Sequence, residues 1–291
     1  LIMSDGPMGV RHEFPNASWE AVGLSDDYVT YFPSNSSLAA TWNEALAERF
    51  GEGLGAEARG RGKDIILGPG INIIRSPLCG RNFEYMSEDP YLIRRLAVPM
   101  IKGIQRQGVA ACVKHFALNN QEHERLEINV EVSERALREL YLPGFKAALL
   151  EGDAYSVMSA YNRFRGTHCS HNPVLLRNIL REEWGYEGVV ISDWGAVHET
   201  EGPVYGGLDI EMNVTFNFED YYMAKPLVEK VKTGEIPESL IDEKVGHILK
   251  MMDKLGMLGR EAVKRPRGDF NHPDHQQTAL AIAEESIILM K

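Results

Sequence analysis

Short apolar runs along the chain are separated by longer stretches in which apolar residues recur at helical spacing. The clearest run, Val189 to Ile191, is β-branched without polar alternation, which is typical of a parallel strand buried on both faces. Such runs predict strands at 1–4, 64–68, 109–113, 154–159 and 189–191, and a sixth strand is predicted at 208–212. The helical spacing predicts helices at 37–61, 87–107, 133–150, 173–184, 221–233 and 237–255.

This alternation of strand and helix is that of βαβ units, in which each helix crosses over to a parallel strand. An open doubly wound sheet and a closed (β/α)8 barrel both fit it. The glycine fingerprint of a dinucleotide site or a Walker loop does not follow the first strand, which counts against nucleotide-binding forms of the open sheet. We therefore predict a TIM-like (β/α)8 barrel in which one or two strands are irregular or hidden in loops.

A change in composition divides the chain near residue 260. Residues 1–259 carry the barrel pattern, whereas 260–277 are rich in Arg, Pro, Gly, Asp, His and Asn, which predicts a linker. Residues 278–291 are helical and then apolar, as expected for the start of a second α/β domain that the chain does not contain. The chain opens on Leu1, within a predicted strand, so we expect a fragment or a processed piece.

The overall composition excludes several classes of function. With 44% hydrophobic and 25% charged residues among 291, the chain can bury an ordinary globular core. A net charge of -11 argues against binding to nucleic acids or anionic membranes. The apolar runs are all shorter than the roughly 20 residues that span a bilayer. The three cysteines, odd in number and far apart, support neither a disulfide framework nor a zinc site.

Four predicted strands end in charged or hydrogen-bonding aromatic groups. These are Asp5, Lys114 with His115, Tyr161 with Asn162, and Asp193 with Trp194. In a barrel such ends converge on the face where barrel enzymes carry out their chemistry. Taken singly, each is better explained as a satisfied polar residue at a strand end, and Asp193 is equally well explained as the cap of the next helix. Together they favour a functional site.

The residue types indicate the ligand. Asp, Arg, Lys, His and Tyr beside a Trp suit a molecule with many hydroxyls and an apolar ring face, which describes a sugar. Metal binding by His115, His123 and the carboxylates is the alternative, but neither a His-x-His pair at a strand end nor an HExxH motif is present. A serine nucleophile has less support, since the G-x-S-x-G elbow is missing.

The chain resembles the amino-terminal barrel domain of glycoside hydrolase family 3, which contains many β-glucosidases. The resemblance covers most of the chain and is carried by five ordered motifs: SDGPMGVR (4–11), GPGINIIRSPLCGRNFEYMSEDPYL (68–92), KHFALNNQEHER (114–125), SAYN (159–162) and SDWGA (192–196). Motifs this long are specific for the family and less so for the substrate.

The resemblance implies a role for each matched residue. Asp193 would be the nucleophile that forms a covalent glycosyl intermediate, which makes the enzyme retaining. The hydroxyls of the terminal sugar would be held by Asp5, Arg81, Lys114, His115 and Arg125, with Tyr161 near the nucleophile and Trp194 against the sugar ring. The cations would keep the pKa of Asp193 low enough for attack as a carboxylate. Neither a cofactor nor a metal is implied.

One departure narrows the expected branch of the family. The single-domain hexosaminidase branch carries its proton donor in a loop beginning KHFPGHG, whereas this chain reads KHFALNN from Lys114. The sequence therefore resembles the multidomain branch, whose acid/base glutamate comes from a second domain. In-chain candidates for that role are Glu84, Glu88, Glu122, Glu124 and Glu211, and none lies in a motif that marks a proton donor.

The leading hypothesis is an exo-acting retaining β-glycosidase, with β-glucosidase as the favoured activity on oligosaccharides or aryl glucosides. β-Xylosidase, broad-specificity and glycoside phosphorylase activities remain open within the same chemistry. A non-catalytic sugar-binding barrel is the alternative from another class.

Overall fold

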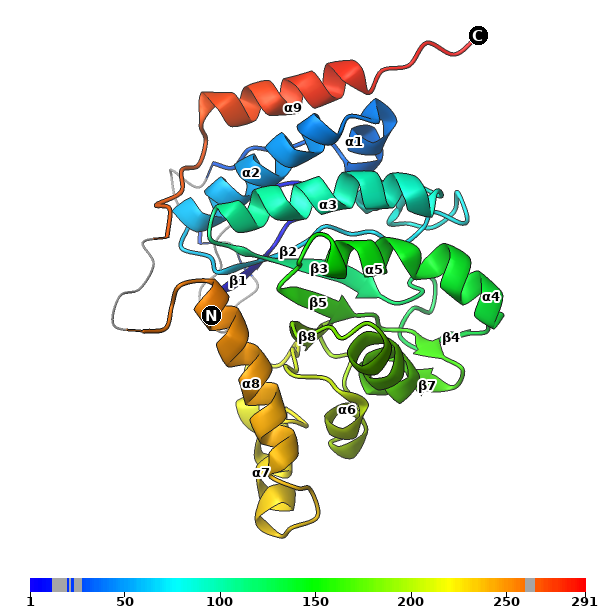
Figure 1. Cartoon of the computed structure of the whole chain (residues 1–291), viewed down its shortest axis with the longest axis vertical. Helices are drawn as coiled ribbons and strands as arrows, with labels where there is room; N and C mark the ends of the chain where they lie inside the picture. The colour runs from blue at the N-terminus through cyan, green and yellow to red at the C-terminus, as the bar shows by residue number, and fades with distance from the viewer. Residues whose placement is uncertain (12–19, 21, 24–27, 260–264) are drawn as a thin grey trace.

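A curled sheet of five parallel strands forms the centre of the computed structural model, which describes residues 1–11, 20, 22–23, 28–259 and 265–291 (Figure 1). The five strands of this sheet lie side by side in the order in which they occur along the chain. Each connection between them is therefore a crossover of the βαβ kind. The strands, in sheet order, are β1 (Met3–Asp5), β2 (Ile65–Leu67), β3 (Ala110–Phe116), β5 (Ser156–Ser159) and β8 (Val189–Ser192).

The prediction of an α/β fold of the barrel type is confirmed, and the structure refines the strand count. Five of the six predicted strands are present in parallel register. The sixth, predicted at 208–212, is reduced to one parallel bridge between Ile191 and Ile210. Within the described residues the strands therefore form an arc and not a closed ring of eight.

Alternate residues of each strand face two separate cores. Ile66, Val157 and Val190 point outward into the main core beneath the helices, whereas Ile65, Met158 and Ile191 point into a smaller cluster on the concave face. Burial on both faces explains why the strands read as unbroken apolar runs. The outer layer consists of α1 (Asn35–Thr41), α2 (Glu44–Gly60), α3 (Pro90–Arg106), α5 (Pro143–Leu150) and the π-helical η4 (Val174–Glu183).

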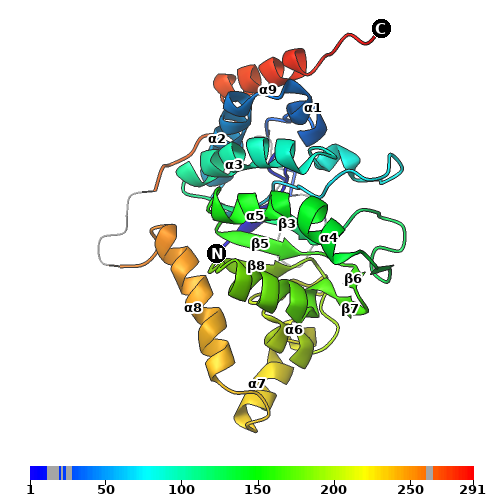
Figure 2. The ribbon, with the colours of Figure 1, turned by 45° about the vertical axis from the view of Figure 1, so that its right-hand side comes forward.

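Helix α8 (Ser239–Lys254) lies away from this layer, as Figures 1 and 2 show. Met251 and the helix-ending Leu255 are buried in the concave cluster beside Ile65, Ala110 and Val189. The helix therefore supplies apolar side chains to the inner face of a sheet that does not close on itself.

Local chemistry sets several boundaries that differ from the prediction. The helix predicted at 37–61 is two helices, because Trp42 takes a left-handed conformation (φ 55°) and Asn43 caps α2. Asp89, and not Ser87, caps α3 by accepting from the Tyr91 amide. The helix predicted at 133–150 is divided before Pro143, which lacks the amide hydrogen that a continuing helix needs.

The remaining elements are short or lie at the carboxyl side of the chain. They are η1 (Asn82–Glu84), β4 (Asn129–Val130), α4 (Glu134–Ala136), η2 (Leu137–Tyr141), β6 (Arg163–Phe164), β7 (Thr167–His168), η3 (Cys169–His171), α6 (Glu201–Gly206), η5 (Phe218–Asp220) and α7 (Lys225–Lys232). β4, β6 and β7 form a small second sheet. None of the helices in the described ranges combines the length and apolar character needed to cross a lipid bilayer.

Helix α9 (Pro273–Glu285) begins within the segment predicted as a linker. It packs on α1 and α2, burying Ile282, and His275 Nδ1 lies 2.9 Å from the buried Glu57 carboxylate. Residues 260–264 of the predicted linker lie outside the described residues. The division into a barrel domain (1–259), a linker and a second domain from 278 stays a prediction.

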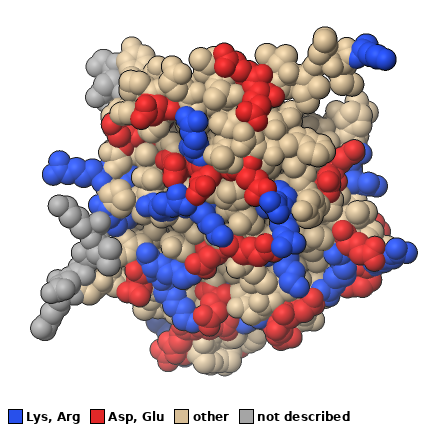
Figure 3. All heavy atoms as spheres, turned by 45° about the horizontal axis from the view of Figure 1, so that its top comes forward, with Lys and Arg blue, Asp and Glu red and all other residues tan. Residues whose placement is uncertain are grey.

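Helices α2 and α3 pack through glycines, which allow a close approach of their backbones. A Cβ added at Gly103 would meet the backbone oxygen of Glu48, and one added at Gly51 would meet that of Met100. Outside this contact, Arg106 pairs with Glu48 and Glu52. Figure 3 shows acidic and basic side chains interleaved over this face. Such exposed pairs contribute little, so the close backbone approach and the apolar side chains that both helices bury in the main core hold the two helices together.

We expect Gly103→Ala to lower the free energy of unfolding by about 1–3 kcal/mol, because the new methyl group overpacks the α2–α3 contact. Gly246→Ala is the matched control, since Gly246 lies within α8 with nothing within 4 Å of the added Cβ. It should raise stability by up to about 1 kcal/mol through helix propensity. Thermal unfolding of both variants tests the pair, and equal stabilisation would contradict the close contact.

Candidate active site

The carboxyl edge of the sheet gathers the chemically active side chains. Asp5 ends β1, Lys114 and His115 lie within β3, and Asp193 directly follows β8. Gly70 forms a parallel bridge with Lys114, which brings the loop after β2 to the same edge. That loop carries Arg81 in the turn before η1.

A chain of charges crosses this edge. Lys114 Nζ lies 2.9 Å from Asp5 Oδ1 and 2.9 Å from Glu84 Oε1, and Arg81 Nε lies 2.6 Å from Glu84 Oε2. The Lys114 side chain is only 3% exposed. Burial opposes its charge, but the two carboxylates outweigh burial and raise the pKa of Lys114. The same cations lower the pKa of Glu84 and of Asp5 against the opposing effect of burial.

His115 is held as a neutral imidazole with one defined tautomer. Its Nε2 lies 2.9 Å from Arg81 Nη2, which can only donate, so Nε2 accepts and Nδ1 carries the proton. Nδ1 then donates to the Tyr85 hydroxyl at 3.0 Å. Burial first, then the charges of Arg81 and Lys114, keep the pKa of His115 well below its usual range. The ring therefore offers no positive charge to Asp193, whose Oδ2 is 3.6 Å from Nε2.

Asp193 is a buried carboxyl group, and its ionisation in the folded protein is energetically unfavourable. Burial raises its pKa to about 6, although Lys114, Arg81 and the Tyr161 hydroxyl act in the opposite direction. The Tyr161 hydroxyl donates to the Trp194 carbonyl oxygen at 2.8 Å and lies near the carboxylate. The group is therefore mostly ionised at pH 7 but protonated below pH 6.

Two further predicted residues border Asp193. The guanidinium of Arg125 lies 4.8 Å from the centre of the Tyr161 ring, and its Nη1 is 2.7 Å from Glu122 Oε2. Trp194 is partly buried and packs against the concave cluster. All eight residues predicted from the sequence thus lie in one connected region: Asp5, Arg81, Lys114, His115, Arg125, Tyr161, Asp193 and Trp194. Their roles toward a ligand stay a prediction.

Sequence reasoning missed the residues that hold His115 in place. Asn72 accepts from the His115 amide at 2.7 Å and donates to its carbonyl oxygen at 2.9 Å. Asn119 donates to the Tyr85 hydroxyl at 2.8 Å. The sequence gives little indication of Asn72 and Asn119, because their contacts join segments that are distant along the chain. Glu84 was considered only as a proton donor, although its position three residues after Arg81 could have indicated an ion pair.

The carboxylates considered as proton donors are mostly occupied. Both Glu84 oxygens are bound by cations, and Glu122 is paired with Arg125. Glu88 and Glu124 are exposed. Glu211 is buried, which raises its pKa, but its oxygens accept from the Met223 amide (2.7 Å) and from Asn213 (3.1 Å). Within the described ranges, no group of three or more His, Cys, Asp or Glu is arranged to hold a metal ion.

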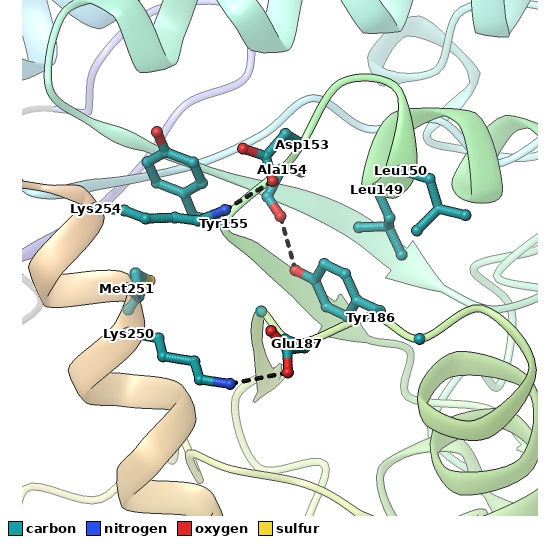
Figure 4. Close-up of a pocket in the computed structure, with 12 residues that line it drawn as sticks. Leu149, Leu150, Asp153, Ala154, Tyr155, Tyr186, Glu187, Lys250, Met251 and Lys254 are labelled. Carbon is teal, nitrogen blue, oxygen red and sulfur yellow. Dashed lines mark hydrogen bonds and ion pairs between the residues drawn. The ribbon is translucent and has the colours of Figure 1, made fainter.

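A separate pocket of about 210 Å³ lies between the segments that precede β5 and β8 and the end of α8 (Figure 4). Lys250 is 2.9 Å from Glu187, and Lys254 is 2.7 Å from Asp153. Tyr186 donates to the Ala154 carbonyl oxygen at 3.0 Å. The two lysines that line this pocket are thus already paired with carboxylates. None of the eight residues predicted for the active site lines it. The pairs join α8 to the amino edge of the sheet.

We expect Asp193→Asn to stabilise the folded protein at neutral pH. A pKa of about 6 against an ordinary 3.8 means that ionising Asp193 in the folded state costs up to about 3 kcal/mol. The folded state binds the proton more tightly, so this cost appears as the pH rises from about 4 to 6. The melting temperature of Asp193→Asn should exceed that of the wild type at pH 7.5, with the difference shrinking at pH 4.

Asp64→Asn is the control, because we expect it to change the melting temperature in the opposite direction. Despite burial, hydrogen bonds from Arg265 and from the Ile2 amide lower the pKa of Asp64, so its carboxylate stabilises the fold above pH 4. Asp64→Asn should therefore melt lower than the wild type at pH 7.5. A lower melting temperature for both variants would refute the proposed cost at Asp193.

Comparison with known proteins places the chain in a family. Residues 21–251 match the model of the glycosyl hydrolase family 3 N terminal domain. The whole chain is 48% identical to a β-glucosidase of Bacteroides ovatus and 43% identical to thermostable β-glucosidase B of Acetivibrio thermocellus. It is 36% identical to an exo-α-(1→6)-L-arabinopyranosidase of Bifidobacterium breve. The chain spans 40%, 37% and 37% of these proteins.

Solved structures agree with this assignment. A β-glucosidase of Streptomyces venezuelae in complex with D-glucose matches with a TM-score of 0.89 at 35% identity, over 98% of this chain and 36% of that one. β-Glucosidase 3B of Thermotoga neapolitana in complex with glucose matches with a TM-score of 0.87 at 40% identity, over 99% and 40% of the respective chains. The chain therefore belongs to glycosyl hydrolase family 3, as its N-terminal domain.

Proposed function

We propose that the protein to which this domain belongs is an exo-acting, retaining β-glycosidase, with β-glucosidase as its leading activity. The observation that carries the proposal is the buried Asp193 carboxylate at the carboxyl end of β8, beside Lys114, Arg81 and Tyr161. β-Glucosidases among the relatives, and two structures in complex with glucose, support it.

Asp193 acts as the nucleophile. Its carboxylate oxygen attacks the anomeric carbon of the terminal sugar, the glycosidic bond breaks, and a covalent glycosyl intermediate forms that water later releases. Attack requires the ionised carboxylate, which Lys114, Arg81 and the Tyr161 hydroxyl favour against burial. Neutral His115 leaves this balance unchanged.

The surrounding groups hold the sugar. The Asp5 side chain is 47% exposed and can accept hydrogen bonds from hydroxyls remote from the broken bond. Arg81, Arg125 and Lys114 donate to hydroxyl oxygens, and His115 Nε2 can accept once a hydroxyl displaces Arg81 from it. The Trp194 indole packs against the apolar face of the ring.

The leaving oxygen needs a proton, and a retaining pair of carboxyl groups stands only about 5 to 5.5 Å apart. Glu84 and Glu122 are engaged by cations, and Glu211 is engaged by hydrogen-bond donors. We assign the acid/base to a carboxyl-terminal domain of the same protein, after the proposed linker at 260–277. The greater length of the relatives supports this assignment.

Other sugars fit the same chemistry. β-Xylosidase, broad-specificity and phosphorylase activities use the same nucleophile, and the relative from Bifidobacterium breve is named for an arabinopyranose substrate. A panel of nitrophenyl glycosides, assayed with and without phosphate, ranks these activities. Preference for another sugar would overturn glucose as the substrate and leave the mechanism intact.

The nucleophile is tested by covalent labelling of the full-length protein. A 2-deoxy-2-fluoro glucoside should add one sugar mass to the peptide that contains Asp193, because the intermediate forms faster than it breaks down. Asp193→Asn should block labelling and lower turnover by several orders of magnitude.

Mass spectrometry and turnover measurements together distinguish this mechanism from a non-catalytic sugar-binding domain. An unlabelled protein under saturating reagent would favour a non-catalytic sugar-binding domain. A variant that kept more than about a tenth of the wild-type rate, a difference of about 1.4 kcal/mol in the barrier, would mean that Asp193 is not the nucleophile.

The proposed division of labour predicts the behaviour of residues 1–291 expressed alone. General acid catalysis contributes about 10²- to 10⁴-fold, so this segment should be nearly inactive on cellobiose. Dinitrophenyl glucosides, whose leaving group needs no proton, should still glycosylate Asp193 slowly. Circular dichroism and thermal unfolding check that the segment is folded. Cellobiose turnover near that of the full-length protein would place the proton donor within the segment.

A further inference from the structure

We propose that Glu84 is a positioning residue of this site, whose two carboxylate oxygens hold Lys114 and Arg81 where the sugar hydroxyls bind. The inference rests on the proposed function, because it explains how the sugar-binding cations are kept in place. Glu84 itself is not expected to touch the sugar.

The backbone around Glu84 is fixed to the helical layer. Asn35, in α1, donates from its side chain to the Glu84 carbonyl oxygen at 2.8 Å. The Ser36 hydroxyl lies within hydrogen-bonding distance of the carbonyl oxygens of Asn82 (2.8 Å) and Tyr85 (3.2 Å). The 3₁₀ turn η1 therefore stands on the first turn of α1. In such a turn, side chains three residues apart lie on one face, which aligns Arg81 with Glu84.

The Glu84 carboxylate has no free face for a ligand. Its side chain is 7% exposed, against 47% for Asp5. One oxygen is bound by Lys114 and the other by Arg81. A sugar hydroxyl could reach Glu84 only by displacing buried Lys114 or partly buried Arg81. Glu84 therefore acts through these cations, whereas Asp5 remains open to a ligand on its exposed side.

Glu84 also links two pairs of contacting residues into one network. On one side Lys114 reaches Asp5, and on the other Arg81 reaches His115. Without the carboxylate, Lys114 would depend on Asp5 alone, and sugar hydroxyls would compete for the same Asp5 oxygens. Arg81 would lose the contact that aims its second nitrogen at His115 Nε2.

The charge of Glu84 matters for Asp193 as well. Among the described residues, the charged or titratable groups that act on Asp193 or lie near it include Lys114, Arg81, Arg125, the Tyr161 hydroxyl, neutral His115 and the buried Cys112 thiol. Replacing Glu84 by glutamine leaves the two cations with one negative charge fewer between them. The net positive charge near Asp193 then rises, which lowers the pKa of its carboxyl group. A lower pKa moves the acid limb of the pH profile to lower pH.

The test uses the full-length protein with Glu84→Gln and Glu84→Asp. Glutamine keeps the size and removes the charge, whereas aspartate keeps the charge and shortens the reach by one methylene. Asp64→Asn is the matched control, because Asp64 is also a buried carboxylate bound by an arginine, near the opposite end of β2. Covalent titration with the 2-fluoro glucoside corrects each rate for the fraction of active protein.

We expect Glu84→Gln to reduce kcat/KM at least tenfold, mainly through KM, and to move the acid limb to lower pH. Glu84→Asp should restore the acid limb to its wild-type position while KM stays raised. Asp64→Asn should lower the melting temperature and leave KM and the pH profile unchanged. This pattern separates positioning from a purely structural effect, which would reduce only stability and active fraction.

Two kinetic results would overturn the proposal. One is a Glu84→Gln protein with kcat/KM within twofold of wild type. The other is a loss confined to active fraction, with KM and the acid limb unchanged. Glucose binding, measured by calorimetry, needs no turnover and keeps the inference separate from the proposed function. At least tenfold weaker binding by Glu84→Gln supports the positioning role even if labelling fails at Asp193, and unchanged binding contradicts it. Glu84→Asp supplies the same measurements where Glu84→Gln does not fold.

Discussion

The ammonium group of Lys114 is the constraint on which the site depends. It lies at the carboxyl end of a strand whose residues are all buried, so its charge must be balanced inside the protein. A buried cation with a partner removed is strongly destabilising, whereas one held by two carboxylates is tolerated. Asp5 comes from β1 and Glu84 from the loop after β2, so this balance exists only when three separate segments are in place. The charge balance of the site therefore depends on the assembled arc of strands.

The strand pattern predicted the positions that follow from local sequence. Asp5, Lys114 and Asp193 follow or end apolar runs, and the carboxyl ends of parallel strands lie on one edge whatever the helices do. The predicted residue at 210 shows the limit of this reasoning. The segment 208–212 alternates apolar and acidic residues (LDIEM), yet only Ile210 forms a bridge to β8, and α8 supplies neighbouring side chains of the concave face. The sequence of a segment does not by itself show which element will pack beside it.

The contacts that hold the predicted residues could not be found in the same way. Tyr85 and Asn72 meet His115 across some 30 and 43 positions of sequence, and the segments involved have no period. The family resemblance named the residues proposed to bind the sugar but not the residues that hold them in place. The α9 boundary had a related cause: His275 looked like linker composition, yet it pairs with a glutamate buried in α2. Composition describes a segment, whereas burial depends on what lies opposite it.

The site is electrically close to balanced apart from Asp193, the proposed nucleophile. Lys114 and Arg81 are matched by Asp5 and Glu84, so little positive charge remains to offset the burial of Asp193, and its pKa stays raised. A more cationic site would stabilise the carboxylate further, but it would also weaken it as a nucleophile. The fold therefore carries an unfavourable buried charge at the proposed point of attack, and the apolar packing on both faces of the sheet supplies the stability that allows it.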